Sequence, residues 1–132
     1  MPTNTKALIA VVDDDESVRE ALSGLLRSLG FAVASFPSAV AFLDSTTIEN
    51  TSCLIADVHM PRMTGVELHG RLTQLGRAIP TILITAYPDD AVKARALAEG
   101  VVGYLSKPFD DDALITCVGS ALDKTEPDHD AP

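Results

Sequence analysis

The sequence predicts an α/β fold: a single doubly wound domain in which helices cover both faces of a five-stranded parallel sheet. Three observations lead to this prediction. The chain has 132 residues, which suits one domain with one hydrophobic core. Five short apolar runs alternate with five segments in which apolar residues recur at helical spacing, and this alternation is typical of βα units. The runs are continuously apolar, as strands buried on both faces are.

The predicted strands end at residues with phosphate or metal chemistry. The apolar runs are residues 7–12, 31–34, 53–56, 82–84 and 101–105. Asp13 and Asp14 follow the first run, Asp57 the third, Thr85 the fourth, and Lys107 comes one serine after the fifth. The second run ends at Ser35, which adds no such chemistry, so its strand is expected beside the site without contributing to it. In parallel sheets the ligand crevice lies beyond the carboxyl ends of the strands.

Helical patterns fill the segments between these runs. They cover residues 18–29, 37–43, 64–75, 89–99 and 110–123. Asp14 or Asp15 can cap the first helix, and Gly30 can end it. The segment 89–99 is rich in alanine and has a thin apolar face, which suits a weakly held helix or an ordinary surface helix. We expect one domain over residues 1–123 and a flexible acidic tail, or the start of a linker, over 124–132.

The general rules for such sheets suggest the strand order. Crossovers between parallel strands are right-handed, and the common order for a small sheet of this flavodoxin-like kind is 2-1-3-4-5. We adopt that order from the rule. It places the first and third strands side by side, so that Asp13 and Asp14 face Asp57.

Composition excludes several classes of function. The net charge is −9, from 19 acids and 10 bases, which argues against direct nucleic-acid contact by this segment. Two cysteines are too few for a secreted disulfide scaffold. The first residues are polar and no long apolar stretch follows, so we expect neither a signal peptide nor a membrane span. These features predict a cytoplasmic protein.

Three carboxylates at one edge of the sheet require a compensating charge. An all-oxygen donor set suits Mg²⁺, with Mn²⁺ as a possible substitute, whereas the three histidines lack the cysteine spacing of a zinc site. A carboxylate in such a site can attack phosphorus and form an aspartyl phosphate. Lys107 can then neutralise phosphoryl charge, and the Thr85 hydroxyl can donate a hydrogen bond.

Each of these residues also has a plainer explanation. The acids at 13–16 are equally compatible with an ordinary charged helix start. Asp57 could be a loop cap, Thr85 a common strand-end residue, and Lys107 a solvated surface charge. Their occurrence at four strand ends in a fixed order favours a joint site.

Four segments resemble the receiver domain of two-component response regulators, the CheY-like superfamily. They are Val11-Val12-Asp13-Asp14-Asp15-Glu16, the stretch from Asp57 to Gly65 that reads DVHMPRMTG, Thr85-Ala86, and Lys107-Pro108-Phe109. The resemblance covers about residues 6–123. Ser17-Val18-Arg19 and Lys107-Pro108-Phe109-Asp110 are similar to the FixJ-type branch of this family.

The resemblance implies a role for each matching residue. Asp57 is expected to accept a phosphoryl group from a sensor histidine kinase. The implied metal ligands are Asp14, Asp57 and the backbone carbonyl of His59, with Asp13 acting largely through water. Phosphoryl oxygens are expected to contact Lys107, Thr85 and Ala86, and Thr85 and Tyr104 form the switch pair. The Lys107–Pro108 bond is expected to be cis, because the free-energy cost of a cis peptide bond is small before proline.

Three further positions are assigned from the residues around the site. His59 and Tyr87 are expected at the pocket rim, where Tyr87 could shield the phosphorylated aspartate from water. Gly65 would permit a tight turn before the third helix, or be incidental. Tyr104 could also be a half-buried aromatic that only packs against the fourth helix.

These assignments predict a switch rather than a turnover enzyme: a phosphoprotein of phosphorelay signal transduction that supports its own phosphorylation and slow autodephosphorylation. Phosphorylation is expected to change the face formed by the fourth helix, fifth strand and fifth helix. That face could control an output domain in transcription regulation, a partner, or a homodimer. One alternative is a haloacid-dehalogenase-type phosphohydrolase, with Asp13 as nucleophile in a D-x-D pair. Another is a degenerate receiver that only binds proteins.

Overall fold

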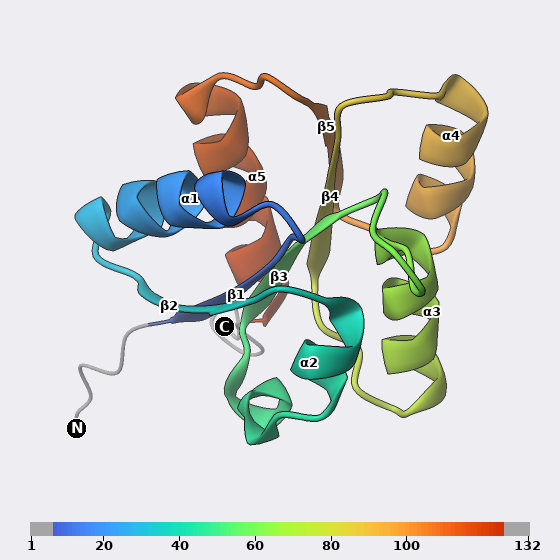
Figure 1. Ribbon diagram of the computed structural model, residues 1–132, viewed down its shortest axis with the longest axis horizontal. Helices are drawn as coiled ribbons and strands as arrows, with labels where there is room; N and C mark the ends of the chain where they lie inside the picture. The colour runs from blue at the N-terminus through green and yellow to red at the C-terminus, as the bar shows by residue number, and fades with distance from the viewer. Residues whose placement is uncertain (1–6, 126–132) are drawn as a thin grey trace, which may run out of the picture.

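Five parallel strands form one sheet in the order β2-β1-β3-β4-β5, which confirms the expected α/β topology (Figure 1). The computed structural model describes residues 7–125. The strands are β1 (Leu8–Val12), β2 (Ala32–Phe36), β3 (Cys53–Asp57), β4 (Thr81–Thr85) and β5 (Gly103–Ser106). All four strand pairs are parallel.

Helices cover both faces of the sheet. α1 (Glu16–Ser28) and α5 (Asp111–Thr125) lie on one face. α2 (Ala39–Leu43), α3 (Gly65–Gln74) and α4 (Asp90–Ala98) lie on the other. A short 3-10 helix, η1 (Thr46–Asn50), follows α2. The described helices are too short or too polar to cross a membrane.

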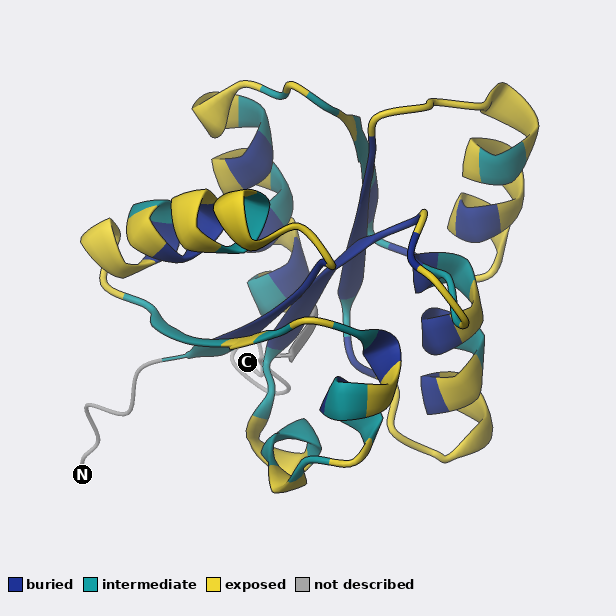
Figure 2. Cartoon of the chain, in the orientation of Figure 1, coloured by how far each residue is buried: buried dark blue, intermediate teal, exposed yellow. Residues whose placement is uncertain are grey.

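The two faces of the sheet carry two separate hydrophobic clusters. Along β1, Ile9 and Val11 pack with Leu22 and Leu26 on the α1 side, while Ala10 and Val12 belong to the opposite cluster. This alternation follows from the two-residue period of a strand. Because the central strands are wholly enclosed (Figure 2), their carboxyl ends form a rigid base for the loops that follow.

Local sequence explains where most helices begin and end. The Asp15 carboxylate accepts hydrogen bonds from the backbone N–H groups of Ser17 and Val18, so Asp15, one of the two expected residues, caps α1. Thr64 and Glu67 form a reciprocal capping box at the start of α3, a device that satisfies two backbone donors. Gly30, which follows the C-cap Leu29 of α1, has a φ of 96°, and a residue with a Cβ adopts such an angle at a cost.

The structure corrects several boundaries. β2 continues to Phe36, two residues beyond the predicted run, because it pairs with β1 as far as Val12. β5 begins at Gly103 rather than at residue 101. η1 was not expected, since its polar sequence has no apolar period. α5 continues through Thr125, and the rest of the predicted tail, 126–132, lies outside the described residues.

Candidate functional site

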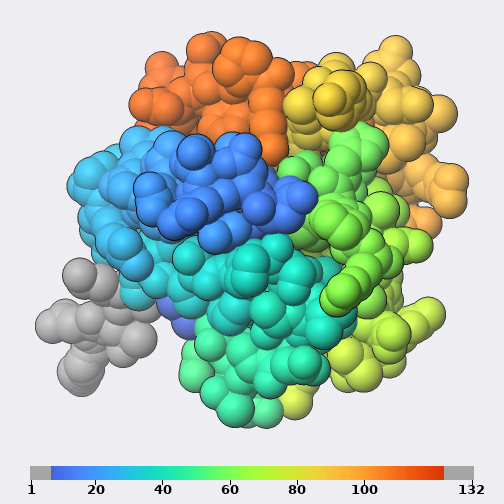
Figure 3. All heavy atoms as spheres, viewed as in Figure 1, coloured from blue at the N-terminus to red at the C-terminus, as the bar shows by residue number. Residues whose placement is uncertain are grey.

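Three carboxylates meet beyond the ends of β1 and β3. One oxygen from each of Asp13, Asp14 and Asp57 lies within 4.8 Å of the others. The two strands are hydrogen-bonded neighbours, with Val12 opposite Ala56, so Asp57 at the end of β3 and the two acids that follow β1 are brought together. In Figure 3 the loop after β1 and the loop after β3 meet on the visible face of the molecule. The three predicted acids therefore lie close together at one edge of the sheet.

The three acids differ in exposure. Asp13 is 0% exposed and Asp57 is 6% exposed, whereas Asp14 is open to solvent. Asp57 Oδ1 accepts a hydrogen bond from the backbone N–H of His59 at 3.1 Å. The site therefore has two buried oxygen donors and one exposed donor, all from carboxylates. Such hard oxygen ligands are those that Mg²⁺ prefers, so the residues present fit this ion.

Lys107 bridges the two buried acids. Its Nζ lies 3.1 Å from Asp13 Oδ2 and 3.3 Å from Asp57 Oδ2. The backbone N–H of Lys107 donates to the Thr85 carbonyl at 2.7 Å, and the Lys107–Pro108 peptide is cis as expected. The loop after β5 therefore directs the ammonium group into the acidic cluster, where its charge compensates the carboxylates in part.

Burial and charge act on the site in opposite directions. Burial raises the pKa of Asp13 most, and the Asp57 charge raises it further, while the Asp15 N–H and Lys107 lower it; the net pKa lies above its ordinary value. Burial alone would lower the pKa of Lys107, but its hydrogen bonds and charge interactions with Asp13 and Asp57 raise it overall. The cluster is thus short of positive charge even with Lys107 in place.

Thr85 is wholly buried at the end of β4. Its Oγ1 accepts a hydrogen bond from the backbone N–H of Tyr87 at 2.9 Å. Ala86, between them, is exposed and lines a mostly apolar hollow together with Lys107 and Pro108. Thr85, Ala86 and Lys107 therefore belong to neighbouring loops at the same edge of the sheet.

His59 and Tyr87 contact each other across the two loops that follow β3 and β4. Their rings meet edge to face, with centroids 5.5 Å apart and an interplanar angle of 80°. Tyr87 is 72% exposed, and His59 is exposed as well. Both side chains are thus exposed and form a pair of their own outside the cluster of acids.

Tyr104 on β5 is linked to the start of α4. Its hydroxyl oxygen accepts a hydrogen bond from the backbone N–H of Asp89 at 3.2 Å, and the Asp89 carboxylate caps α4 through Ala91 and Val92. Tyr104 is half-buried and packs against the cluster on the α3–α4 side of the sheet. Tyr104 is therefore tied to the start of α4 through its hydroxyl, while its ring belongs to the hydrophobic cluster.

Steric contacts explain why residue 65 is a glycine. A Cβ at this position would lie 2.5 Å from the Asp57 carbonyl oxygen and 3.0 Å from a methyl carbon of Leu83. Gly65 is also the first residue of α3 rather than part of the preceding turn. The absence of a side chain allows α3 to begin directly against the backbone of the acid-bearing strand.

Two contacts of Asp13 were missed by reasoning from the sequence. Its backbone N–H donates to the Phe36 carbonyl at 3.2 Å, so β2, which lies at the sheet margin as expected, holds the Asp13 backbone. Its backbone carbonyl accepts from Arg19 Nη1 at 2.7 Å. The position of Arg19, one turn after a capping aspartate, was the available signal, because helical side chains lean toward the N-terminus.

Asp15 cannot serve as the second acid of a D-x-D pair in this structure, because its carboxylate caps α1. This weakens the phosphohydrolase alternative.

Comparison with known proteins points to one family. The response regulator receiver domain family matches residues 9–119. Nodulation protein W of Bradyrhizobium diazoefficiens is 41% identical over 121 residues, which are 92% of this chain and 53% of that protein. The transcriptional regulatory protein FixJ of the same species is 38% identical, covering 93% of this chain and 60% of that protein. This chain therefore spans little more than half the length of these curated relatives.

A solved structure of the response regulator StyR has the same fold. It superposes with a TM-score of 0.86 at 40% identity, covering 96% of this chain and 64% of that one. The family match extends from β1 into α5 and includes all four strand ends that carry the site. The sequence match, the 2-1-3-4-5 sheet and the acidic cluster facing a lysine agree, and the chain belongs to the response regulator receiver domain family.

Proposed function

We propose that Asp57 is the phosphoacceptor of this receiver domain and takes its phosphoryl group from a sensor histidine kinase. The observation that carries the proposal is the bridge from Lys107 to Asp57 and Asp13 beside a three-carboxylate cluster. An Asp57 oxygen forms a bond to phosphorus as the phosphorus–nitrogen bond of the kinase phosphohistidine breaks. The released imidazole nitrogen takes up a proton.

Asp13, Asp14, Asp57 and the His59 carbonyl would hold Mg²⁺, with Mn²⁺ as a substitute. The bound ion supplies positive charge that offsets both the carboxylates and the phosphoryl oxygens. The donor chemistry of the three clustered acids supports this assignment. Lys107 supplies the remaining charge, because its ammonium group is already held next to Asp57.

Thr85, Ala86 and Tyr104 would couple this chemistry to the surface. Lys107 and the Thr85 hydroxyl each bind a phosphoryl oxygen, with Ala86 beside them. Drawing Thr85 inward alters the loop to Asp89, which the Tyr104 hydroxyl holds. The face of α4, β5 and α5 then presents a changed surface. We propose that this face controls an output region or a homodimer, in transcription regulation, as the names of the longer relatives suggest.

Incubation with acetyl phosphate and Mg²⁺, followed by intact mass measurement, tests the proposal. We expect a labile phosphoryl adduct on the parent, since acetate leaves as the Asp57–phosphorus bond forms. The adduct is lost with Asp57→Asn and kept with Asp112→Asn, an exposed acid in the first turn of α5. An adduct that survives Asp57→Asn, or none on the parent, contradicts the assignment.

Turnover distinguishes this switch from a phosphohydrolase. A receiver consumes acetyl phosphate only slowly, through phosphorylation and hydrolysis of its own aspartate. Steady turnover of p-nitrophenyl phosphate that persists in Asp57→Asn would favour the hydrolase. The domain limit at residue 123, the cytoplasmic location and the lack of nucleic-acid contact by this segment stay predictions.

A further inference from the structure

Asp13 is held at each of its polar groups. Its N–H donates to Phe36, its Oδ1 accepts from the Asp15 N–H at 2.9 Å, and its Oδ2 pairs with Lys107. The backbone carbonyl accepts from Arg19 Nη1 at 2.7 Å, the shortest of these contacts. In the Arg19 bond, a side chain donates to the backbone of Asp13. This bond therefore holds the Asp13 backbone in place and does not act on its carboxylate.

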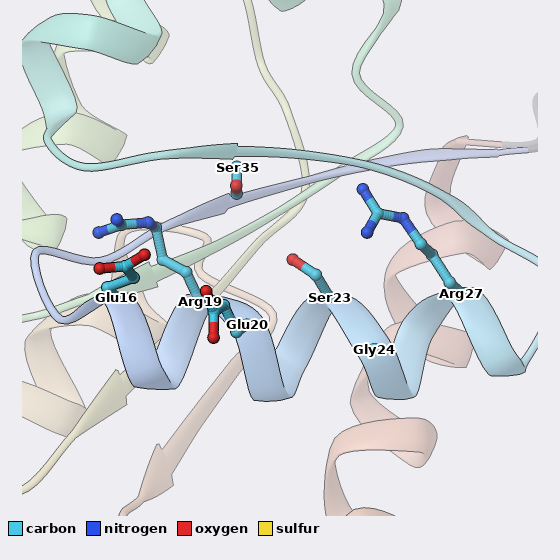
Figure 4. A pocket seen from close by; sticks show the side chains of 7 residues that line it. All are labelled: Glu16, Arg19, Glu20, Ser23, Gly24, Arg27 and Ser35. Atoms are coloured by element: carbon cyan, nitrogen blue, oxygen red, sulfur yellow. The ribbon is translucent and has the colours of Figure 1, made fainter.

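Arg19 reaches this carbonyl because of its place in α1. The helix begins at Glu16 after its cap at Asp15, and side chains of a helix lean toward its N-terminus. Figure 4 shows Arg19 extending from α1 toward the strand-end loop, along a groove of about 380 Å³ between α1 and β2. Its guanidinium thus reaches Asp13 from α1, whereas the Lys107 ammonium reaches it from the end of β5.

Arg27 offers a natural comparison. It lies further along α1 on the same groove, and its Nη2 donates to the carbonyl of Val33 on β2 at 3.4 Å. The two arginines share a helix, a groove and a type of bond. Only Arg19 touches one of the three clustered acids.

The Arg19 bond fixes a peptide plane that two of the acids share. The Asp13 carbonyl lies in the plane that also holds the Asp14 nitrogen and both Cα atoms. Holding that oxygen restricts rotation of the whole Asp13–Asp14 unit. The exposed Asp14 has no hydrogen-bond partner for its carboxylate among the bonds found in the described residues, so its direction depends on this plane.

We propose that Arg19 is a positioning residue for the divalent-cation site: it holds the Asp13 carbonyl so that the Asp13 and Asp14 carboxylates converge with Asp57. The inference rests on the proposed metal role of these acids. It adds a residue outside the set that the sequence resemblance implies.

The direction in which removal of Arg19 changes cation affinity distinguishes a positioning role from a purely electrostatic one. A guanidinium near a cation site repels the cation, so if Arg19 acted through charge alone, its removal would strengthen cation binding. If Arg19 positions the acids, its removal weakens binding, because partners behind metal ligands typically contribute about tenfold or more to affinity.

Mn²⁺ titration of the unphosphorylated protein, followed by electron paramagnetic resonance of the free ion, makes this measurement. We expect Arg19→Gln to bind Mn²⁺ about tenfold more weakly than the parent. Arg19→Lys, which keeps a donor on a long side chain, should recover part of the loss. Arg27→Gln, which removes the same charge from the same groove, should bind as the parent does. Unchanged or tighter binding by Arg19→Gln overturns the proposal.

Amide hydrogen exchange of the metal-free protein tests the same idea without the ion. The Asp13 and Asp15 N–H groups, which bond to Phe36 and to the Asp13 carboxylate, should exchange severalfold faster in Arg19→Gln and unchanged in Arg27→Gln. Equal exchange in the parent and Arg19→Gln contradicts positioning. If the parent binds no Mn²⁺ and Arg19→Gln still exchanges faster than the parent, the metal site is contradicted. The role of Arg19 in holding the loop is then retained.

Discussion

Asp13 shows how one buried carboxylate limits the stability of the metal-free domain. It is wholly enclosed, and burial is the largest reason that its pKa lies above the ordinary value of 3.8. Lys107 compensates it only in part, and it shares that lysine with Asp57. The negative charge of Asp13 therefore lowers the stability of the metal-free fold. Such a cost is expected of a residue that is kept for function.

The pH dependence of stability follows from this shift. Because the pKa of Asp13 is higher in the folded state, that state binds more protons between the unfolded and folded pKa values, and stability falls as pH rises through this window. In Asp13→Asn this fall is absent. In EDTA, the unfolding free energy of the variant should therefore increase relative to that of the parent as the pH rises from about 4. Urea unfolding between about pH 3 and pH 8 measures it. A difference that is flat with pH would show that Asp13 does not cause it.

Tyr87 and His59 form an aromatic pair over the loops beside Asp57. We predict that this pair limits the access of water to the phosphorylated aspartate, since exclusion of water slows hydrolysis. Tyr87→Ala should shorten the lifetime of the phosphorylated protein severalfold, whereas Tyr87→Phe, which keeps the ring contact, should not. Loss of the phosphoryl mass after removal of acetyl phosphate gives the rates. Equal lifetimes in the parent and Tyr87→Ala would contradict the shielding role of Tyr87.

At the scale of elements, α3 is placed by the close approach of its first residue to β3. Gly65 leaves no room for a Cβ beside the Asp57 carbonyl, whereas a Cβ on Gly70, within the same helix, would meet nothing within 4 Å. Backbone atoms cannot move aside as the end of a flexible side chain can. The start of α3 and the acid-bearing strand are therefore coupled at this point.

The two glycines of α3 should respond oppositely to the same substitution. Gly65→Ala should lower the unfolding free energy by about 1–3 kcal/mol through overpacking. Gly70→Ala should raise it by about 0.5–1 kcal/mol, because alanine is the better helix former and space is open. Urea unfolding of both variants decides the matter. Destabilisation by both would point to a general intolerance of α3 instead of the contact at Gly65.

At the scale of the whole molecule, the sheet gathers separate segments into one charged site. Charged residues from the ends of β1, β3 and β5 converge there, and the three acids outnumber the one lysine among them. Any ion that binds this site in the folded state and not in the unfolded chain must stabilise the fold by mass action.

Saturating Mg²⁺ should therefore stabilise the parent domain. At a concentration 100 times the dissociation constant, the unfolding free energy should rise by about 2.7 kcal/mol. Asp57→Asn should lose most of this increment and Asp112→Asn should keep it, because Asp112 lies on α5 outside the cluster. Thermal unfolding with and without Mg²⁺ provides the test. An equal gain in both variants would mean that the ion acts elsewhere.

Much of the site could be predicted from the sequence because its signals are local. Each strand is a continuous apolar run; Asp13, Asp57 and Thr85 stand directly after such runs, and Lys107 follows its run after one serine. Once the topology rule supplies neighbouring strands, these residues must share an edge. The helix cap at Asp15 is likewise a matter of residues within one turn.

The sequence by itself determined the order of elements, the family and the set of acids, hydroxyl and lysine at the strand ends, since periodicity and motif spacing are properties of neighbouring residues. Only the tertiary structure decided how those groups are held. The bond from Asp13 to Phe36, the bridge from Lys107 to two acids, the contact of Arg19 with the Asp13 carbonyl and the closeness of Gly65 to Asp57 depend on distances of a few ångströms. Packing of the sheet and its helices sets most of these distances. Only the Arg19 contact had a local signal, the place of Arg19 one turn after the capping Asp15.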